Sequence, residues 1–538
     1  MDKRTLVRIS ALWLSIPLAV SLVSDVVAQP VKPAPRTWSA LPLEIRDALQ
    51  PGRFLYSNQI SSGPFGAQLP TMDDRVDWDD IDFTLDQFSA AGLKWIRDGA
   101  VAGFDNFQKP DQMKNWNPPE FWLRFCKGAK ARGINLVVTL RVISGPGGKC
   151  TAYPEGHRAL VEWIKVIVPK LKPWVKDWEI DNEPNPEIPP AMYVQGVRAA
   201  YAAIKKIDPE ARVHAGVLSM LECMTPAAKG GREPYPDKNS SYVDGLIAAG
   251  LTDCCDVVSI HPYRQPYVLE NIPEHASEFR PWRTWKDYPE QILALKARLR
   301  KAKGRDMPIA ITEVGFPTHF NRETGRPEIS ETAAAKYMLR AHVMDHWLGI
   351  DPIIHFAFKR QVQGLFELEA HFSLVNPEWI RQPRYFAMSA LCSLLDGRDK
   401  PLDLKARIVS TEPGSEPVYQ FAFQRNHDFD VVRYANPAPG RYEPKERVKE
   451  RAEMVTLFFW RAAPAQEGDS AAPVRFDVQL PDAGYAHPIL LDPMTMATVP
   501  YRELKFDARE AAVTIHGLSI RDYPQAVRFY KWKSGDKP

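Results

Sequence analysis

Two carboxylates in this sequence stand at the ends of apolar runs, where a charged side chain is costly to place unless it is paired or used. The segment "WEIDNEPNPEIPP" ends its run at Asn182 and Glu183, and "PIAITEVGF" carries Glu313 near its end. The first segment alone also fits an ordinary strand followed by a polar turn. Two facing carboxylates can take different protonation states, because each ionised group raises the pKa of the other. Such a pair suits cleavage of a glycosidic bond, which needs one acid and one nucleophilic carboxylate.

Three further polar residues belong to similar runs. Arg97 lies in "LKWIRD", and His261 and Tyr263 lie in "DVVSIHPY". Arg97 and Tyr263 could keep a nearby carboxylate ionised and oriented, one by its charge and the other by a hydrogen bond. Asn182 could bind a sugar hydroxyl without titrating. A single histidine at a strand end often serves only as a structural donor, so a structural and a substrate-binding role are both open for His261.

Short apolar runs alternate with stretches of helical periodicity from about residue 52 to residue 360. The eight runs are 53–57, 93–98, 134–142, 175–183, 212–218, 256–263, 308–316 and 352–360. Eight strands that alternate with helices predict an α/β fold, a parallel (β/α)8 barrel, whose active site lies at the C-terminal ends of the strands. An open doubly wound sheet is the alternative, but the count of eight and the lack of a Gly-rich turn favour the barrel.

Two amphipathic helices stand out between the runs. Their apolar residues are Val194, Val197, Tyr201 and Ile204 in the first helix and Ile292, Leu295 and Leu299 in the second. The spacing of three and four residues places each set on one helix face. Ser330 is expected to cap the helix that follows the seventh run.

The pattern changes after "PRYFAMSALCSLLDG", residues 383–397, which is expected to form the last helix. Beyond it, short strand-like segments separated by turns predict an accessory antiparallel β-sandwich over residues 398–538. Packing is the expected role of this domain, and sugar binding is the alternative. No Gly/Ser-rich linker separates it from the barrel domain, residues 51–397, so a large interface is expected rather than a flexible hinge.

The N-terminal segment has the layout of a secretory signal peptide. A basic start is followed by "ISALWLSIPLAVSLV" and by small residues that allow cleavage after Ala28. A membrane anchor is the alternative, although the apolar run is short for a span and contains Pro17. Residues 29–50 are rich in proline and predict a linker or an arm. We therefore expect a secreted or periplasmic monomer without stable membrane insertion.

Composition and motifs narrow the classes of function. The 69 basic and 66 acidic residues nearly balance and no basic block stands out, so a nucleic-acid partner is not expected. The six cysteines show no CxxC spacing, and no HExxH, GxSxG or phosphate-binding loop occurs, so neither a metal nor a cofactor is expected. A disulfide between Cys150 and Cys223 is a hypothesis, since both lie in loops expected on one face of the barrel.

The motifs resemble those of a known group of enzymes. "DNEP" after the fourth run and "TEVG" in the seventh are similar to the signature of the large clan A of retaining glycoside hydrolases. The "HPY" of the sixth run is similar to the corresponding element of family 5 in that clan. The spacing of the acidic pair and the C-terminal β-sandwich resemble glycoside hydrolase family 39 and its relatives most. The resemblance covers about residues 50 to 400.

The resemblance implies a role for each matching residue. Glu183 would be the general acid/base and Glu313 the nucleophile. Asn182 would bind the sugar 2-hydroxyl. The remaining residues that it places in the substrate site are Arg97 beneath the nucleophile, Tyr263 bonded to it, and His261 in the same subsite.

Aromatic residues are expected to line the sugar site. The clan usually places a tryptophan on strand eight, but this sequence has Phe356 and Phe358 in "IIHFAFKR", and a phenylalanine can still stack on a sugar. The long loop after the sixth run adds Trp282 and Trp285, although such residues often only pack a loop.

The sequence therefore predicts an exported retaining glycoside hydrolase that cleaves β-glycosidic bonds in a poly- or oligosaccharide by double displacement. A transglycosylase in exopolysaccharide processing would use the same two glutamates. A non-catalytic carbohydrate-binding barrel is a further alternative, although such proteins normally lack one of the two carboxylates. The sugar, its linkage and the choice between endo and exo cleavage stay open at this point.

Overall fold

The structure is a computed structural model that describes residues 54–532 with gaps. The gaps are 70–79, 99–116, 119, 141–149, 186–187, 220–241, 264–287, 319–328, 360–370, 405, 410–417, 435–443, 469–471, 482–484, 499–504 and 510–511. The predicted signal peptide (1–28) and linker (29–50) lie outside the described residues. So do Trp282, Trp285 and Cys223, and the predictions made for them stay predictions.

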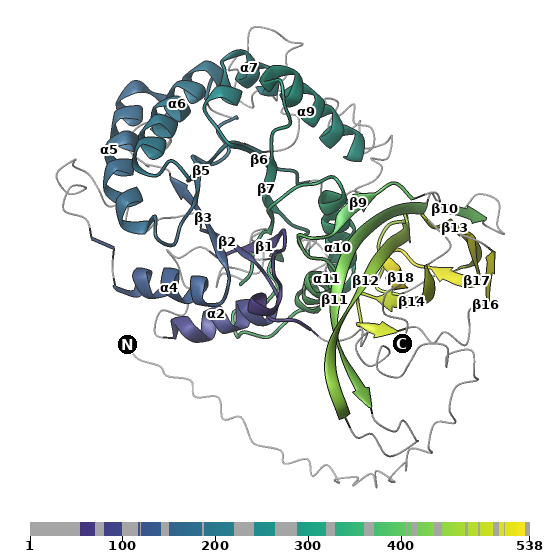
Figure 1. The fold of residues 1–538 in the computed structure, drawn as a ribbon. Helices are drawn as coiled ribbons and strands as arrows, with labels where there is room; N and C mark the ends of the chain where they lie inside the picture. Colours follow the sequence, from purple (N-terminus) through teal and green to yellow (C-terminus); the bar gives the residue numbers. More distant parts are fainter. Residues whose placement is uncertain are drawn as a thin grey trace, which may run out of the picture. The chain divides into compact units, whose positions relative to one another are not determined.

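Eight parallel strands close into a barrel in the order of the chain, which confirms the predicted (β/α)8 fold (Figure 1). The strands are β1 (Phe65–Gln68), β2 (Trp95–Asp98), β3 (Asn135–Leu140), β4 (Asp177–Ile180), β5 (Arg212–Ser219), β6 (Val257–His261), β7 (Ile309–Val314) and β8 (Ile353–His355). The sheet closes because β1 pairs with β2 on one side and with β8 on the other.

Helices alternate with these strands. They are α2 (Ile81–Ala90), α4 (Glu120–Ala131), α5 (Pro154–Leu171), α6 (Pro190–Ile207), α7 (Tyr242–Ala248), α9 (Tyr288–Lys303), α10 (Glu331–Trp347) and α11 (Pro383–Leu394), with short 3-10 turns η2 (Ser57–Gln59), η4 (Cys150–Ala152) and η5 (Leu251–Asp253). The predicted apolar faces are buried at Val194, Val197 and Ile204 in α6 and at Ile292, Leu295 and Leu299 in α9. The predicted cap of α10 is also present, because the Ser330 hydroxyl accepts a hydrogen bond from Ala333 N (3.1 Å).

The first strand differs from the prediction. The run 53–57 was expected to form it, but residues 54–56 have no regular structure, and Phe54 and Tyr56 are exposed. The strand is instead β1, whose sequence "FGAQ" contains two small residues. A Cβ on Gly66 would stand 2.3 Å from the backbone oxygen of Trp95 on β2, so only glycine fits there. The apolar pattern of residues 53–57 therefore belongs to a surface segment. The true first strand has a weaker apolar pattern, because the close approach of β1 and β2 requires a residue with no side chain.

The barrel interior is apolar in the middle and charged at the C-terminal end. Trp95, Val137 and Ile354 form one buried cluster from β2, β3 and β8. Two residues further along β2, Arg97 lies on the same strand face as Trp95, because side chains alternate along a strand. Arg97 therefore brings a charge into the barrel on the C-terminal side of Trp95.

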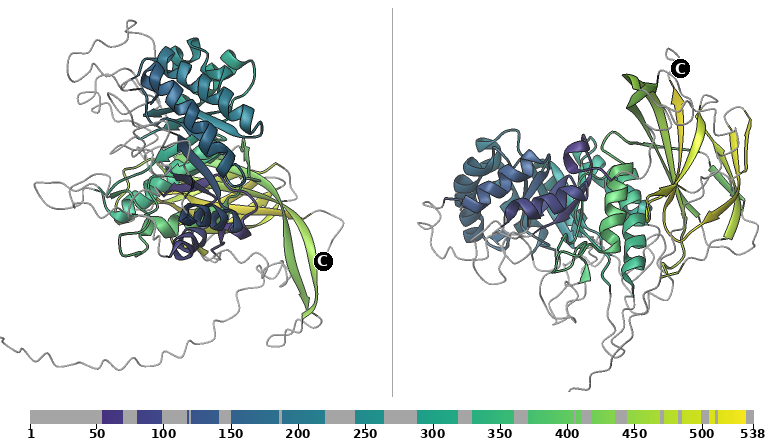
Figure 2. Two further views of the ribbon diagram at one scale, coloured as in Figure 1. Left: turned by 90° about the vertical axis from the view of Figure 1, so that its left-hand side faces the viewer. Right: turned by 90° about the horizontal axis from the view of Figure 1, so that it is seen from below.

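The C-terminal strands form two antiparallel sheets, as predicted (Figure 2). The first contains β10 (Ala406–Val409), β13 (Ala472–Gln479), β17 (Ala512–Ile520) and β16 (Lys505–Arg509), and the second contains β15 (Ala497–Thr498), β14 (Ala486–Asp492), β18 (Gln525–Trp532), β12 (Pro444–Arg461), β11 (Val418–Tyr434) and β9 (Lys400–Leu402). One apolar cluster joins residues of both, for example Phe476 and Ile515 of the first sheet with Phe459 and Phe529 of the second. A shared core between two sheets is the defining feature of a β-sandwich.

Helix α10 makes polar and aromatic contacts with the sandwich. Lys336 Nζ is paired with Asp522 Oδ1 at 2.8 Å, and Arg340 Nη2 donates to the Ala463 carbonyl at 2.8 Å. The His346 ring stacks on Phe423, with 5.0 Å between ring centroids. Every residue of α10 from position 333 to 346 is buried, so this helix has no solvent face over that length.

Among the residues that the structure describes, no helix combines the length and the hydrophobicity needed to cross a membrane.

Candidate active site

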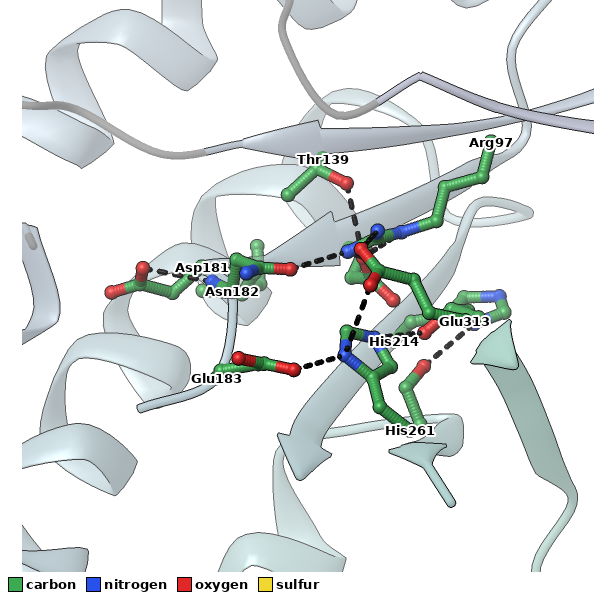
Figure 3. Close-up of polar contacts among 12 residues, drawn as sticks. Arg97, Thr139, Asp181, Asn182, Glu183, His214, His261 and Glu313 are labelled. Carbon is green, nitrogen blue, oxygen red and sulfur yellow. Dashed lines mark hydrogen bonds and ion pairs between the residues drawn. The ribbon is translucent and has the colours of Figure 1, made fainter. Parts of the chain in front are cut away.

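The polar residues singled out from the sequence meet at the C-terminal mouth of the barrel (Figure 3). Arg97 comes from β2, and Glu313 comes from β7. His261 is the last residue of β6, and Asn182 and Glu183 directly follow β4. Direct contacts connect all of these residues through Arg97 and His261, as the following paragraphs describe.

Arg97 is the centre of the polar network, with 1% of its surface exposed. Its Nε donates to Glu179 Oε1 (2.7 Å), its Nη2 donates to Asn182 Oδ1 (2.8 Å), and its Nη1 donates to Glu313 Oε1. Burial alone would lower the pKa of Arg97, but the carboxylates of Glu179 and Glu313 raise it above its ordinary value. The guanidinium therefore stays charged, and its fork fixes three side chains at once.

Glu179 is a site residue that the sequence reasoning missed. It is fully buried on β4, and Thr139 donates a second hydrogen bond to its Oε1 at 3.0 Å. Burial works to raise the pKa of Glu179, yet Arg97 and His261 outweigh this effect and lower it. Glu179 is therefore ionised, and it shares the charge of Arg97 with Glu313. The available signal was a carboxylate inside the apolar run "WEI", four positions before Glu183.

Glu313 is held by both of its oxygens. Arg97 binds Oε1, and the Tyr263 hydroxyl donates to Oε2 at 2.8 Å. Burial and the charge of Glu313 raise the pKa of Tyr263 well above its ordinary value, so this hydroxyl keeps its proton and remains a donor. The Glu313 side chain is 11% exposed, which leaves a small part of a fixed carboxylate open to the barrel mouth.

Glu183 has different surroundings. Its side chain is 29% exposed, and its Oε1 lies 2.9 Å from Nδ1 of the buried His261. The other ring nitrogen of His261 lies 3.1 Å from Thr312 Oγ1. His261 thus contacts the more exposed of the two carboxylates directly, while its Nδ1 is 3.8 Å from Glu313 Oε2.

The backbone that presents Glu183 is unusual. Asp181 and Glu183 both have left-handed backbone angles, with φ of 65° and 47°, which are costly for residues other than glycine. Asp181 stabilises the turn, because its Oδ1 accepts from Asn182 N at 2.8 Å and its Oδ2 accepts from the Thr151 hydroxyl. This turn directs Asn182 toward Arg97 and Glu183 toward His261. Asp181 and Thr151 are further contributors that the sequence reasoning missed.

The two glutamates lie close together. One oxygen of Glu183, one oxygen of Glu313 and a ring nitrogen of His261 all lie within 4.8 Å of one another. Three such ligand atoms could in principle surround a metal ion. The Arg97 guanidinium already occupies Glu313 Oε1, and a permanent cation at that position disfavours a second one nearby. The donor set therefore fits an acid–base pair better than a metal centre.

Aromatic rings lie beside Glu313. Tyr263 contacts Phe356 and Phe372 edge-on, at 6.5 and 5.9 Å between centroids, and Phe356 is partly exposed. Phe358 differs from the prediction that placed it in the sugar site. It is fully buried and packs on Phe88 of α2 at 4.8 Å, because it belongs to the layer between strands and helices.

No protein-family model and no curated protein sequence matches the chain. Solved structures do match. A family 39 glycoside hydrolase from Bacteroides cellulosilyticus aligns with a TM-score of 0.56 and 16% identity over 89% of this chain and 82% of that one. The chain shares its fold.

Two other matches have lower scores. A family 39 enzyme from Xanthomonas axonopodis pv. citri has a TM-score of 0.47, with 14% identity over 88% of this chain and 95% of its own. A monomeric β-xylosidase from Caulobacter crescentus has a TM-score of 0.46, with 14% identity over 88% and 97%. The match to the Bacteroides enzyme confirms, at the level of the fold, the resemblance to clan A predicted from the motifs.

Proposed function

We propose that this chain is a retaining glycoside hydrolase that cleaves β-glycosidic bonds of a poly- or oligosaccharide. The observation that carries the proposal is the pair Glu183 and Glu313, which have oxygens within 4.8 Å of each other at the barrel mouth. A carboxyl separation of about 5 Å is typical of retaining enzymes, whereas inverting enzymes leave a wider gap for a water molecule. The similarity of fold to a family 39 enzyme supports the same conclusion.

In the first step, Glu183 donates its proton to the glycosidic oxygen while a carboxylate oxygen of Glu313 attacks the anomeric carbon. The bond to the leaving oxygen breaks as the ester to Glu313 forms, so the leaving group departs as a neutral alcohol. Arg97 and Tyr263 fix both oxygens of Glu313 before the reaction, which supports attack without a large movement of the nucleophile.

In the second step, Glu183 takes a proton from water, whose oxygen attacks the anomeric carbon and releases Glu313. The sugar leaves with its original anomeric configuration after two inversions. A transglycosylase would differ only here, because a sugar hydroxyl would replace the water. The partly exposed Glu183 side chain is compatible with either acceptor.

His261 is suited to both protonation states of Glu183. A neutral imidazole has one donor and one acceptor nitrogen. When Nε2 donates to Thr312 Oγ1, Nδ1 can accept a hydrogen bond from protonated Glu183. When the Thr312 hydroxyl donates to Nε2, Nδ1–H can donate to ionised Glu183. His261 therefore remains hydrogen-bonded to the acid/base throughout the cycle, which extends the role expected from the sequence.

Asn182 is suited to bind the substrate. Arginine can only donate hydrogen bonds, so the atom of Asn182 that meets Arg97 must be the amide oxygen. The amide nitrogen is then left to donate to a sugar hydroxyl, and the 2-hydroxyl next to the reacting carbon is the one within reach of a residue adjacent to Glu183.

Trapping of the covalent intermediate tests the proposal. Incubation with a 2,4-dinitrophenyl 2-deoxy-2-fluoro-β-glycoside, in the gluco and xylo forms, should inactivate the protein and leave one fluorosugar on the peptide that contains Glu313. Mass spectrometry of the digest identifies the peptide. Turnover of simple aryl glycosides without any label on Glu313 would contradict the retaining mechanism.

The acid/base role of Glu183 is tested by its alanine variant. Glu183→Ala should lose activity mainly on substrates with poor leaving groups, and azide should partly restore it and yield a β-glycosyl azide. Glu210→Ala is the control, since Glu210 is exposed near the start of β5, at the opposite end of the strands. Equal losses for good and poor leaving groups would argue against proton donation by Glu183.

We also propose that the protein is exported, on the basis of the basic and apolar pattern of its first 28 residues. N-terminal sequencing of secreted material should begin at or near Gln29. Cytoplasmic protein that retains Met1 would contradict this.

A further inference from the structure

Gln68 is the last residue of β1 and stands at the same mouth of the barrel as the two glutamates. In the register of the sheet it lies opposite Arg97 on β2. On the other side, Ala67 pairs with His355 of β8, so Gln68 neighbours the position of Phe356. The residue thus lies between the cation that binds Glu313 and the phenylalanine beside Tyr263.

The side chain of Gln68 faces the barrel interior. Residues paired in register on neighbouring strands point to the same face of a sheet, and Arg97 points inward to Glu179 and Glu313. Alternation along β1 gives the same result, because Phe65 packs outward against His342 and His346 of α10. Gln68, three positions later, therefore points inward.

The Gln68 amide oxygen has no hydrogen-bond partner among the residues that the structure describes. The residue is 6% exposed, and its Oε1 is buried without a hydrogen bond. Leaving such a group unpaired costs roughly 1–3 kcal/mol, and nearly all buried polar side-chain atoms in proteins have a partner. Arg97, its register partner, directs its hydrogen bonds to Glu179, Asn182 and Glu313 instead. Since none of the described residues supplies a donor, a bound ligand with a hydroxyl group would satisfy this oxygen.

We propose that Gln68 is a substrate-binding residue whose amide binds a hydroxyl of the reacting sugar and thereby selects the sugar. This inference rests on the proposed function. Asn182, on β4, is suited to the 2-hydroxyl, and Gln68 comes from a strand three positions away around the barrel. The hydroxyl that reaches Gln68 is therefore the one on C3 or C4 of the ring. A sugar hydroxyl that donates to Oε1 supplies the missing bond.

The proposal predicts opposite effects on stability and on activity. Methionine has nearly the volume of glutamine and no buried amide to leave unpaired. Gln68→Met should therefore keep or raise the melting temperature of the free protein while it lowers kcat/KM by about 10- to 100-fold, the usual effect of one lost hydrogen bond to a buried amide. A purely structural glutamine would instead lose stability on the same change.

The hydroxyl is identified with deoxy substrates. 4-Nitrophenyl β-D-xylopyranoside and β-D-glucopyranoside are compared with their 3-deoxy and 4-deoxy analogues, for wild type and Gln68→Met. Wild type should cleave one of the analogues more slowly than the parent glycoside. Gln68→Met should cleave that analogue no more slowly than the parent. If Gln68→Met lowers kcat/KM relative to wild type by the same factor on the parent glycosides and on every analogue, Gln68 does not contact either hydroxyl and the proposal is wrong.

Gln525→Met is the matched control. Gln525 is also buried, but its Oε1 accepts a hydrogen bond from Arg521 N (3.2 Å) in the sandwich. This variant should lower the melting temperature and leave kcat/KM unchanged. If wild type cleaves no glycoside, the proposed function fails, and Gln68 is judged by stability alone. A lower melting temperature for Gln68→Met would overturn the inference in either case.

Discussion

Two buried cations, Arg97 at the barrel mouth and Lys336 on α10, show how the same interaction can serve different ends. Lys336 is bound by the Asp522 carboxylate and by the carbonyls of Gln466 and Gly468, all protein groups. Arg97 is bound by the fully buried Glu179 and also by Glu313, which keeps part of its surface open. A charge network whose end groups are all buried stabilises the fold. One that ends on a partly open carboxylate holds that carboxylate ready to react.

The largest expected effect comes from removing the open end of the Arg97 network. Glu313→Gln should reduce kcat at least about 10,000-fold, because it removes the proposed nucleophile. The melting temperature should change little, since the amide oxygen still accepts from Arg97 and the amide nitrogen can donate to the Tyr263 hydroxyl. Steady-state kinetics and thermal unfolding measure the two quantities. If the variant is inactive only because it unfolds, the contrast between the Arg97 network and the Lys336 network is wrong.

The second effect concerns the closed network. Lys336→Met leaves the Asp522 carboxylate buried and unpaired, so the free energy of unfolding should fall by about 3–5 kcal/mol. Activity per folded molecule should stay at the wild-type level, because no group at the barrel mouth is touched. Denaturant unfolding and active-site titration measure these quantities.

The double variant Lys336→Met with Asp522→Leu serves as the control for that prediction. Replacing both charges with apolar groups should recover most of the lost stability. If the double variant stays as unstable as the single one, the ion pair itself is not the source of the loss.

The effect that is smallest for each residue concerned depends on pH. Burial lowers the pKa of His342 and His346 on α10 to about 4. The unfolded chain binds these protons near pH 6.5, whereas the folded chain binds them only near pH 4. Stability should therefore be unaffected above pH 7 and should fall as the pH drops from about 6.5 to about 4, by up to roughly 3 kcal/mol for each histidine.

Thermal unfolding between pH 4 and pH 8 measures this loss. His342→Gln should flatten the pH dependence relative to wild type, because one of the histidines with a lowered pKa no longer takes up a proton on unfolding. An unchanged slope would show that other groups cause the acid sensitivity. His342 is in α10 and is not part of the proposed site, so the pH profile of kcat per folded molecule should not move with it.

The barrel and the main site residues could be predicted from sequence because both depend on local patterns. Seven of the eight runs contain the strands, and the polar residues at their ends meet at one mouth. Glu179 could not be found in this way, since its importance comes from Arg97, which is far away in the sequence and is brought near by barrel closure. β1 was missed because its neighbour Trp95 demands Gly66, and close packing of this kind has no apolar signature.

The sugar-stacking residues show the same limit. Phe356 and Phe358 look equivalent in the sequence, two positions apart in one apolar run. The structure directs them to different surroundings, one partly exposed beside Tyr263 and the other buried against α2. Which of two similar side chains reaches a ligand is decided by the backbone at the end of the strand.

The burial of α10 on all sides also bears on the history of this chain. A helix whose every face is covered by a fixed neighbour cannot lose one of those neighbours without exposing Arg340, His346 and the apolar residues between them. Gene fragments that end before the C-terminal sheets would encode a barrel with an uncovered helix. The two parts are therefore expected to be inherited and exchanged together, as one evolutionary unit.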